Sequence, residues 1–560
     1  MIARKVRELG VRADVRPSDT PASELAGARG VIISGGPASV YDSDSPTVDP
    51  GLLTQPAPVL GICYGQQIFA HALGGEVKPG EKGEYGPARL QLGAPSNLFS
   101  GWLNDSQVWM SHRDTVEQPP PGFTITASTA TCKVAAMENV ARHLYGVQFH
   151  PEVVHTTQGK ALLRNFVFGI CGCVEDWDPR HRIPLIEEQI RLTVGDRNVF
   201  FFVSGGVDST VAFHLCLRAL GPDRVRGVYV DTGLMREGET AFVRAMFGDT
   251  VAIENAAAHF LKPLARVVEP EEKRHVIGEQ FVLVQERIIE SRHLLDGHWI
   301  LGQGTIYPDT IESGGTKNAA LIKTHHNRVA GIQKLLAANR LVEPLSDFYK
   351  DEVREIGREL GLTAELLDRH PFPGPGLAIR LLCLPANGTL QPLAGGWLVP
   401  VLSVGVQGDS RTYAPILAME HSISHASDLV NSLSGINRVI AQIASRAPLH
   451  QLSVWQSALT PERIERLRQA DATVRRLATA HGFDHAVWQF PVVLIPLGTA
   501  EAPDSVVLRP IQSVDGMTAE AVSIPEPLLA ALAAELLAVP QIAGVFRDLT
   551  DKPPATIEWE

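Results

Sequence analysis

Residues 204–210, Ser-Gly-Gly-Val-Asp-Ser-Thr, have the composition of a loop that binds an anion. They follow an unbroken apolar run at 199–203, typical of a buried parallel strand, and precede an apolar helical pattern at 211–217. Glycines let the backbone approach an anion closely, and the free N–H groups at a helix start favour negative charge. An ordinary glycine turn capped by serine is the alternative, which this strand–loop–helix context disfavours. The predicted ligand is an anion, and the candidate binding residues are Ser204, Gly205, Gly206, Val207, Asp208, Ser209 and Thr210.

The loop holds a single acidic residue, Asp208. A Mg²⁺ ion that bridges two phosphates would account for a carboxylate at this place. The Gly-Lys-Ser/Thr ending of a Walker A loop is absent. We therefore expect a different class of phosphate loop, with Mg²⁺ bound through Asp208 and no organic cofactor.

A second turn, at residues 61–65, has the sequence Gly-Ile-Cys-Tyr-Gly between a short apolar strand and a helix. Glycines on both sides of a nucleophile allow a sharp turn that lifts its side chain above the sheet. A helix N-terminus favours the thiolate over the thiol. This pattern predicts that Cys63 is a nucleophile.

A base for this cysteine is predicted at the end of another apolar strand, in the segment 145–152. His150 and Glu152 are two residues apart, so in an extended chain their side chains project to the same side. Glu152 can then orient the imidazole ring, as the third group of a catalytic triad does. A lone histidine after a strand is more often structural, but here it accompanies the cysteine turn.

The bulk composition excludes several classes of protein. The chain has 560 residues, of which 44% are hydrophobic and 20% charged, and its net charge is −12, which disfavours a general nucleic-acid binder. Six cysteines are too few for a disulfide framework. No stretch is apolar and long enough to span a membrane, and charges at residues 1–8 are unlike a signal peptide. We expect a cytosolic protein with small-molecule substrates and neither nucleic acid nor membrane as a partner.

Strands must alternate with helices to place these loops. Residues 1–10 look helical, and strand ends follow at 30–37, 227–234 and 299–309. Alternating elements predict a parallel, doubly wound sheet, whose ligands sit at the carboxyl ends of the strands. The fold class is therefore α/β over the first two thirds of the chain.

The last third shows weak internal repetition. Apolar and basic positions of 436–448 recur at one fixed offset in 542–554, and each segment follows a strand that begins with proline, at 400 and 491. Chance apolar matching can explain part of this. We expect two related α+β units, about 371–450 and 451–560.

The first third resembles the class I glutamine amidotransferases, through Ser34-Gly35-Gly36-Pro37, the cysteine turn and His150-Pro151-Glu152. The resemblance implies a flavodoxin-like sheet, with Cys63 as nucleophile for the glutamine amide and His150 and Glu152 as its partners. It also implies an oxyanion hole from backbone N–H groups near Gly36 and Tyr64.

The first third departs from this family in one respect. Family members usually begin with a strand and a Gly-Ser-Gln segment ahead of the helix that here is 1–10. The resemblance therefore implies that the first strand is missing, which bears on the stability of the sheet and not on the triad.

Residues 204–210 resemble the SGGxDS loop of the N-type ATP pyrophosphatases, which grip the β- and γ-phosphates of ATP. Together, the three parts of the chain resemble the glutamine-hydrolysing GMP synthetases, in a form whose two C-terminal units are similar to those of the animal enzyme. The segments that carry this resemblance are 302–309, 370–376, 403–411 and 552–560. The XMP contacts that it implies are Asp409, Arg411, Gln489, Lys552 and Glu558.

The predicted domains are 1–177 for the amidotransferase, 178–370 for the ATP pyrophosphatase and 371–560 for the XMP-binding and dimerisation region. The resemblance implies that ATP, XMP and glutamine give GMP, AMP, diphosphate and glutamate, in a monomer or homodimer. Another glutamine-dependent synthetase, such as NAD synthetase, and a non-catalytic nucleotide-binding paralogue are the alternatives. The intact cysteine turn and phosphate loop argue against both.

Overall fold

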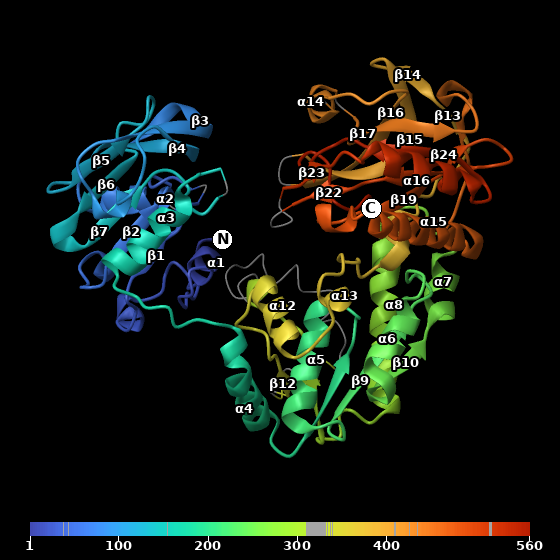
Figure 1. Ribbon diagram of the computed structural model, residues 1–560, viewed down its shortest axis with the longest axis horizontal. Coiled ribbons are helices and arrows are strands. Elements are labelled where there is room, and N and C mark those ends of the chain that lie inside the picture. The colour runs from blue at the N-terminus through green and yellow to red at the C-terminus, as the bar shows by residue number, and fades with distance from the viewer. Residues whose placement is uncertain are drawn as a thin grey trace. The chain divides into compact units, whose positions relative to one another are not determined.

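The protein is described by a computed structural model and forms two compact units, residues 1–181 and 182–560 (Figure 1). The residues it describes are 1–36, 38–42, 44–153, 155–309, 332, 334–335, 338, 340–407, 410–424, 426–433, 435–513 and 518–560, with the backbone alone at 79–83, 406–407 and 410–411. A single hydrophobic cluster within the second unit joins Phe260 and Ile277 to Val474 and Leu532. The predicted domain boundaries, after residues 177 and 370, stay predictions.

The first unit contains a sheet of order β1-β2-β7-β6-β5-β3-β4. β1, β2 and β7 pair in parallel, and the other strands pair antiparallel. Its strands are β1 (Val31–Ile33), β2 (Val59–Ile62), β3 (Glu76–Leu92), β4 (Ser106–Gln118), β5 (Thr124–Ser128), β6 (Ala136–Asn139) and β7 (Leu144–Val147). Its helices are α1 (Ile2–Arg7), η1 (Ala22–Leu25), η2 (Pro50–Leu53), α2 (Tyr64–Ala72), η3 (Asn97–Phe99), η4 (Val140–Arg142), α3 (Gly159–Arg164), η5 (Asn165–Ile170) and η6 (Arg180–Arg182).

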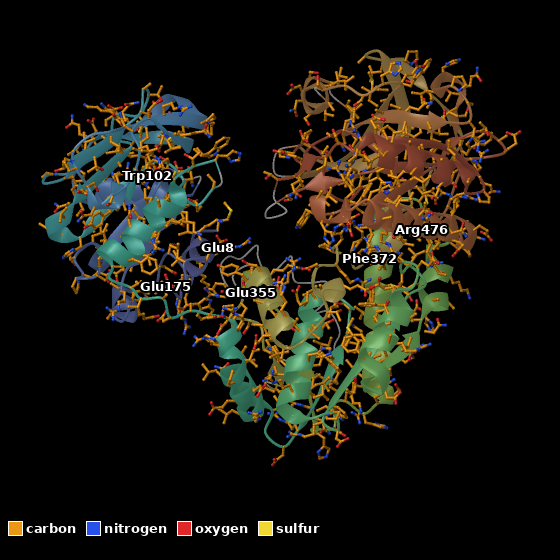
Figure 2. All side chains as sticks on the ribbon, viewed as in Figure 1. Glu8, Trp102, Glu175, Glu355, Phe372 and Arg476 are labelled. Atoms are coloured by element: carbon orange, nitrogen blue, oxygen red, sulfur yellow. The ribbon has the colours of Figure 1, made fainter. Side chains whose placement is uncertain are left out.

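The core of the first unit forms where apolar strand residues meet an aromatic group. Leu60, Ile62 and Val147 are fully buried, as expected for central parallel strands. Trp102, labelled in Figure 2, packs edge-on against Phe99 with ring centroids 5.2 Å apart. The helix predicted at 1–10 is confirmed over Ile2–Arg7. β1 lies at the edge of the sheet.

The second unit begins with a five-stranded sheet of order β10-β9-β8-β11-β12, in which all pairings are parallel. Its strands are β8 (Asn198–Phe202), β9 (Val225–Asp231), β10 (Val251–Asn255), β11 (Trp299–Gly302) and β12 (Leu341–Val342). The helices of this region are α4 (Ile183–Val194), α5 (Val207–Leu220), α6 (Glu239–Phe247), η7 (Gly248–Thr250), α7 (Ala257–Leu264), α8 (Pro270–Ser291), α12 (Lys350–Glu359), α13 (Ala364–Leu367) and η9 (Gly376–Arg380).

Both faces of this sheet are covered by helices, and two neighbouring phenylalanines of β8 show it. Successive strand side chains point to opposite faces. Phe201 meets Phe213 of α5 at a centroid distance of 5.3 Å. Phe200 instead belongs to a cluster that includes Ile289 of α8. The predicted doubly wound sheet is confirmed, and its strand order reverses between β8 and β11.

The last part of the second unit is a seven-stranded sheet of order β14-β15-β16-β17-β24-β21-β19. Its strands are β14 (Gln391–Leu393), β15 (Gly396–Gln407), β16 (Ser410–Met419), β17 (Arg438–Ser445), β19 (Val492–Ile495), β21 (Asp504–Leu508) and β24 (Ile542–Asp548). Shorter strands are β13 (Gly388–Thr389), β18 (Ser453–Val454), β20 (Leu497–Gly498), β22 (Ile511–Gln512) and β23 (Glu520–Ala521). The helices are α14 (Ala426–Ser432), η10 (Leu449–Gln451), α15 (Pro461–Ala480), η11 (Asp484–Ala486) and α16 (Glu526–Ala538).

This sheet contains the same pattern twice. β15 and β16 pair antiparallel, and β17 then lies parallel to β16 after helix α14. In the same way β19 and β21 pair antiparallel, and β24 lies parallel to β21 after helix α16. β17 and β24 pair antiparallel at the centre, so the two halves meet with opposite strand directions. The topology agrees with the repeat predicted from the sequence.

Candidate functional site

The predicted nucleophile, Cys63, occupies the turn between β2 and α2. Its backbone has φ 52° and ψ −108°, a conformation rarely adopted outside glycine. A Cβ placed on Gly65 would lie 2.3 Å from the carbonyl oxygen of Ile33, and one placed on Gly61 would lie 2.2 Å from the ring of Phe69. Both glycines are therefore required by close packing, and the predicted turn geometry is present.

His150 lies beside this cysteine, at the end of the segment that follows β7. Its Nδ1 is 2.8 Å from Oε1 of Glu152, and the two side chains are 17% and 8% exposed. Burial alone would lower the pKa of His150, but hydrogen bonds with Cys63 and Glu152 outweigh it and raise the pKa to about 10. The structure thus brings the three predicted triad residues together, while their catalytic roles stay predictions.

The two residues predicted to form an oxyanion hole also lie at this site. A Cβ on Gly36 would be 3.8 Å from the ring of Tyr64, and one on Gly35 would be 2.9 Å from the imidazole of His150. The loop after β1 therefore approaches both Cys63 and His150 closely. The donation of the N–H groups of Gly36 and Tyr64 to an oxyanion remains a prediction.

Strand β4 completes the surroundings of the cysteine. The carbonyl oxygen of Ser111 lies 3.6 Å from Sγ of Cys63. The neighbouring His112 donates from Nδ1 to the carbonyl of Asp114, 3.0 Å away, and the same carbonyl accepts from Gln67 of α2 at 2.7 Å. These bonds hold β4 and α2 against each other next to the nucleophile.

In the second unit, the loop 204–210 connects β8 to α5 at the point where the strand order of the sheet reverses. Gly205 has φ 75°, which favours glycine. The loop after β11 packs on it, because a Cβ on Gly304 would lie 2.7 Å from the backbone N of Ser209. Ligands of parallel sheets bind at this switch point. The position therefore agrees with a nucleotide site.

The hydroxyl groups of the loop have two different arrangements. The Ser204 and Ser209 hydroxyls are 3.0 Å apart and lie in an exposed setting. Thr210, in contrast, is fully buried and donates to the carbonyl of Gly206 at 2.8 Å. The Thr210 hydroxyl thus serves the first turn of α5, while the prediction that Thr210 belongs to the binding loop stays a prediction.

Asp208 has one paired and one unpaired oxygen. Its Oδ2 is 3.3 Å from Nζ of Lys350, the first residue of α12, and its Oδ1 is buried with no hydrogen-bond partner among the described residues. A carboxylate oxygen left over at a phosphate loop is the ligand type that Mg²⁺ prefers, so the site fits that ion. Lys350 was not predicted as a site residue.

Three of the five predicted XMP contacts, Gln489, Lys552 and Glu558, are described together with their side chains. Gln489 is 7% exposed, and its Oε1 lacks a hydrogen-bond partner within the part of the chain that the structure describes. Lys552 pairs with Ala519 through both backbone hydrogen bonds. Asp409 and the side chain of Arg411 lie outside the described residues.

Glu558 is held by an arginine that was not predicted from the sequence. Arg380 of η9 donates to both carboxylate oxygens, at 2.9 and 2.6 Å. Burial alone would raise the pKa of Glu558, but Arg380 outweighs it and lowers the pKa. Arg380 and Arg236 both stack on Phe372, which Figure 2 labels, at 5.5 and 4.4 Å. Burial lowers the pKa of Arg236 to about 10.

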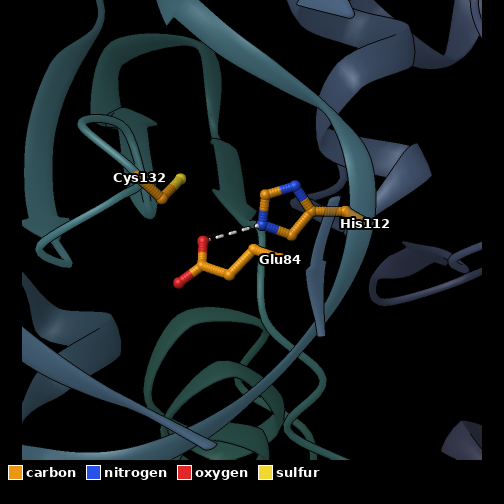
Figure 3. A group of neighbouring side chains, drawn as sticks. All are labelled: Glu84, His112 and Cys132. Atoms are coloured by element: carbon orange, nitrogen blue, oxygen red, sulfur yellow. Dashed lines mark ion pairs between the residues drawn. The ribbon is translucent and has the colours of Figure 1, made fainter. Parts of the chain in front are cut away.

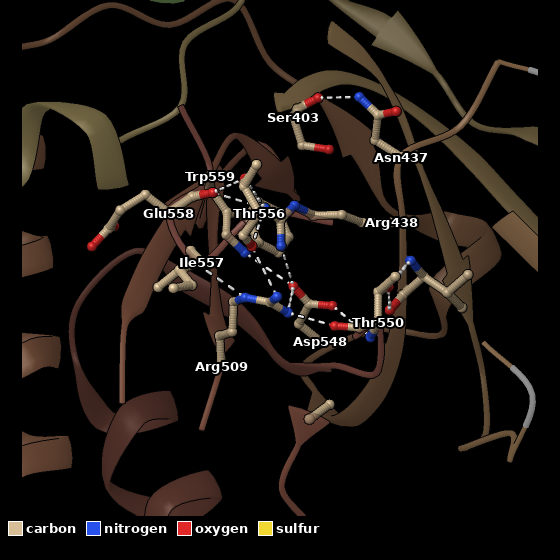
Figure 4. A network of polar contacts seen from close by, with 12 residues as sticks. Ser403, Asn437, Arg438, Arg509, Asp548, Thr550, Thr556, Ile557, Glu558 and Trp559 are labelled. Carbon is tan, nitrogen blue, oxygen red and sulfur yellow. Dashed lines mark hydrogen bonds and ion pairs between the residues drawn. The ribbon is translucent and has the colours of Figure 1, made fainter. Parts of the chain in front are cut away.

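The segment that carries Glu558 is anchored by a buried ion network (Figure 4). Asp548 pairs with Arg438 at 2.8 Å and with Arg509 at 2.7 Å. The indole of Trp559 donates to the same carboxylate at 3.1 Å. Figure 4 shows the carboxylate of Glu558 pointing away from this network. The network therefore fixes the backbone while leaving Glu558 to face another part of the unit.

These features define a glutamine amidotransferase joined to further domains. Residues 1–170 match the glutamine amidotransferase class-I family, and residues 477–559 match the GMP synthase C terminal domain. The chain is 40% identical to a probable GMP synthase (glutamine-hydrolysing) of Leptospira interrogans, covering 100% of this chain and 97% of that protein.

Two further relatives are the glutamine-hydrolysing GMP synthases of Thermomicrobium roseum and Thermobifida fusca. They are 39% and 38% identical over 100% of this chain and 94% and 95% of their own length. The chain belongs to the glutamine-hydrolysing GMP synthase family, and the prediction that it is an enzyme of this family is confirmed. No helix in the described ranges is both long and apolar enough to cross a bilayer.

Proposed function

We propose that this protein makes GMP from XMP, ATP and glutamine, with AMP, diphosphate and glutamate as the other products. The observation that carries the proposal is the presence of two separate sites in one chain. The first unit holds Cys63 beside His150 and Glu152. The second unit holds the phosphate loop with Asp208 at the switch point of a parallel sheet.

In the first unit, the Cys63 thiolate attacks the carboxamide carbon of glutamine. His150 carries the proton that the leaving ammonia takes up, and Glu152 orients its ring through the 2.8 Å contact at Nδ1. Water then cleaves the thioester and releases glutamate. In this proposal the backbone N–H groups of Gly36 and Tyr64 stabilise the oxyanion.

In the second unit, the C2 oxygen of XMP attacks the α-phosphorus of ATP and diphosphate leaves. Ammonia then attacks C2 of adenylyl-XMP and AMP leaves, which gives GMP. Loop 204–210 binds the leaving phosphates through its backbone and serine hydroxyls. Asp208 would hold Mg²⁺, which supplies charge stabilisation to the diphosphate when bound. Gln489, Lys552 and Glu558 would bind XMP, with Asp409 and Arg411.

The direct test is a purified-protein assay of GMP, AMP, diphosphate and glutamate with all three substrates. Cys63→Ala should lower glutamine-dependent synthesis by at least about 10³-fold and leave ammonium-dependent synthesis intact, because only the first unit loses its nucleophile. Cys173→Ala, in the same unit, is the matched control and should keep both activities. Loss of both activities in Cys63→Ala would contradict the separation of the two sites.

The proposed XMP role of Lys552 has an internal control in Arg446, at the equivalent place of the first C-terminal repeat. Arg446 donates to the carbonyl of Ile542 at 2.8 Å, which makes it a structural residue. Lys552→Ala should raise the KM for XMP by about 30-fold or more, since an unpaired buried phosphate costs about 2–5 kcal/mol. Arg446→Ala should leave that KM unchanged. Equal effects would disprove the proposed specialisation of the repeats.

A further inference from the structure

Three side chains with metal-binding atoms converge in the first unit, and the proposed chemistry uses none of them. Figure 3 shows Glu84, His112 and Cys132 pointing toward one another. Their ligating atoms all lie within 4.8 Å of each other. They combine carboxylate, imidazole and thiol, which is a donor set typical of Zn²⁺.

Two of the three residues are neighbours across the β3–β4 ladder. Glu84 and His112 are directly opposite in the antiparallel register, so their side chains share one face of the sheet. Oε2 of Glu84 and Nε2 of His112 are 3.2 Å apart. Two ligands of one tetrahedral zinc, each about 2.1 Å from the ion, are about 3.4 Å apart. The observed spacing therefore matches that of two ligands on one ion.

Both of these atoms are buried and lack a hydrogen bond of suitable geometry in the described part of the chain. The side chain of His112 is 5% exposed and that of Glu84 is 21% exposed. The two atoms face each other as an ion pair without a well-aligned hydrogen bond, and a metal ion would bind to both. The other ring nitrogen of His112 already contacts the Asp114 carbonyl at 3.0 Å, an arrangement that orients metal-binding histidines.

The third ligand is presented by a tight turn. The Cys132 N–H donates to Oγ1 of Thr129 at 2.9 Å, and the Thr129 N–H donates to the Cys132 carbonyl at 2.8 Å. Glu84 is tied to the same turn, because Thr131 donates to its Oε1 at 2.6 Å. Burial raises the pKa of the Cys132 thiol to about 11. Without an ion, this thiol stays protonated at neutral pH.

We propose that Glu84, His112 and Cys132 bind Zn²⁺ or a chemically similar divalent cation, with a fourth position left for water. Binding forms a bond from the metal to Sγ and releases the thiol proton to solvent. The ion would tie β3 and β4 to the turn at 129–132. It would thereby fix the strand whose Ser111 carbonyl lies 3.6 Å from the Cys63 sulfur.

Co²⁺ is a suitable probe, because a cobalt–thiolate bond has a near-ultraviolet charge-transfer band. The experiment uses the full chain carrying Cys63→Ala, so that the nucleophile cannot supply the sulfur. One equivalent of Co²⁺ should produce the band together with visible tetrahedral absorption, and Zn²⁺ should displace it. Absence of binding at one equivalent would overturn the proposal.

Three further substitutions identify the ligands in this background. Cys132→Ser should abolish the charge-transfer band, while Cys173→Ser, the matched control, should retain it. Glu84→Gln, a near-isosteric change at a partly exposed position, should keep the band at saturation but weaken binding by about tenfold or more. A band that survives in Cys132→Ser, or unchanged Co²⁺ affinity in Glu84→Gln, would refute the site. Both outcomes are independent of whether the protein makes GMP.

Discussion

The cysteine turn of the first unit and the phosphate loop of the second are both a parallel strand, a glycine-containing turn and a helix, yet they place backbone strain differently. In the first unit the positive φ, 52°, falls on Cys63 itself. In the second the positive φ, 75°, falls on Gly205. One turn thus accepts strain at a non-glycine residue in order to raise a single side chain. The other turn uses a glycine to expose backbone N–H groups. The serine hydroxyls of the loop are further donors.

The largest expected effect comes from alanine at the glycines of the two turns. Gly65→Ala should abolish glutamine-dependent synthesis and destabilise the first unit, because its Cβ would lie 2.3 Å from a backbone oxygen that cannot move aside. Gly205→Ala would meet Val243 at 3.2 Å, a side chain that can shift. Its left-handed backbone costs about 1–2 kcal/mol, so the KM for ATP should rise by about tenfold or more.

Calorimetry and both activity assays distinguish these two variants. Gly65→Ala should keep ammonium-dependent synthesis, whereas Gly205→Ala should weaken synthesis from either nitrogen source. An intact glutaminase in Gly65→Ala would show that the close approach to Ile33 does not shape the nucleophile turn.

A smaller effect is expected when the carboxylate of the phosphate loop becomes an amide. Asp208→Asn should lower synthesis with glutamine and with ammonium by about 10²–10³-fold, because the proposed Mg²⁺ ligand is lost. The loss is measured as the synthesis rate at saturating ATP, and a Mg²⁺ titration shows whether the mutant needs more of the ion. Lys350→Gln removes the ammonium group that lies 3.3 Å from Asp208. This variant serves as a comparison, because it changes the charge beside Asp208 but keeps the carboxylate. Near-normal ammonium-dependent turnover in Asp208→Asn would exclude this role.

The smallest effect concerns stability of the first unit in Glu152→Gln. Despite burial, contacts with Cys63 and Glu152 raise the pKa of His150 from 6.5 to about 10. The protonated ring therefore stabilises the fold fully below pH 6.5, and this contribution is lost as the pH rises through about 10. A loss near 1 kcal/mol corresponds to about 2–4 °C in melting temperature.

Melting curves of wild type and Glu152→Gln should accordingly be furthest apart at or below pH 6.5 and converge toward pH 10. A difference that stays constant over this range would mean that Glu152 supports the fold without acting on the charge of His150.

The sequence predicts the two turns well because each is encoded within a few residues. Glycines flank Cys63, and His150 and Glu152 are two residues apart on an extended segment, so neighbouring positions determine the geometry. The C-terminal repeat was also detectable, because its two copies keep one offset between 436–448 and 542–554.

The pairs that the sequence did not predict join distant segments. Lys350 meets Asp208 across 142 residues, and Arg380 meets Glu558 across 178. Such contacts depend on strand order and on how η9 and α12 pack, which no local pattern encodes. Thr210, by contrast, makes a local contact, because its hydroxyl donates to the Gly206 carbonyl in the first turn of α5. Arg380 follows the proline-rich segment 370–376, which contains Phe372. An arginine so close in sequence to this loop is the signal that could have indicated it.

The buried tail also has a consequence for how the chain is made. The side chain of Glu560 pairs at 2.7 Å with Lys273, which is fully buried and 287 residues earlier in the sequence. At about 5–20 residues per second, a ribosome needs roughly 15–60 s to add those 287 residues after Lys273. Over that interval the ammonium group of Lys273 lacks the Glu560 carboxylate with which it is buried in the folded protein. The second unit can therefore complete its interior only after Glu560 has been synthesised, whereas the first unit does not wait for that residue.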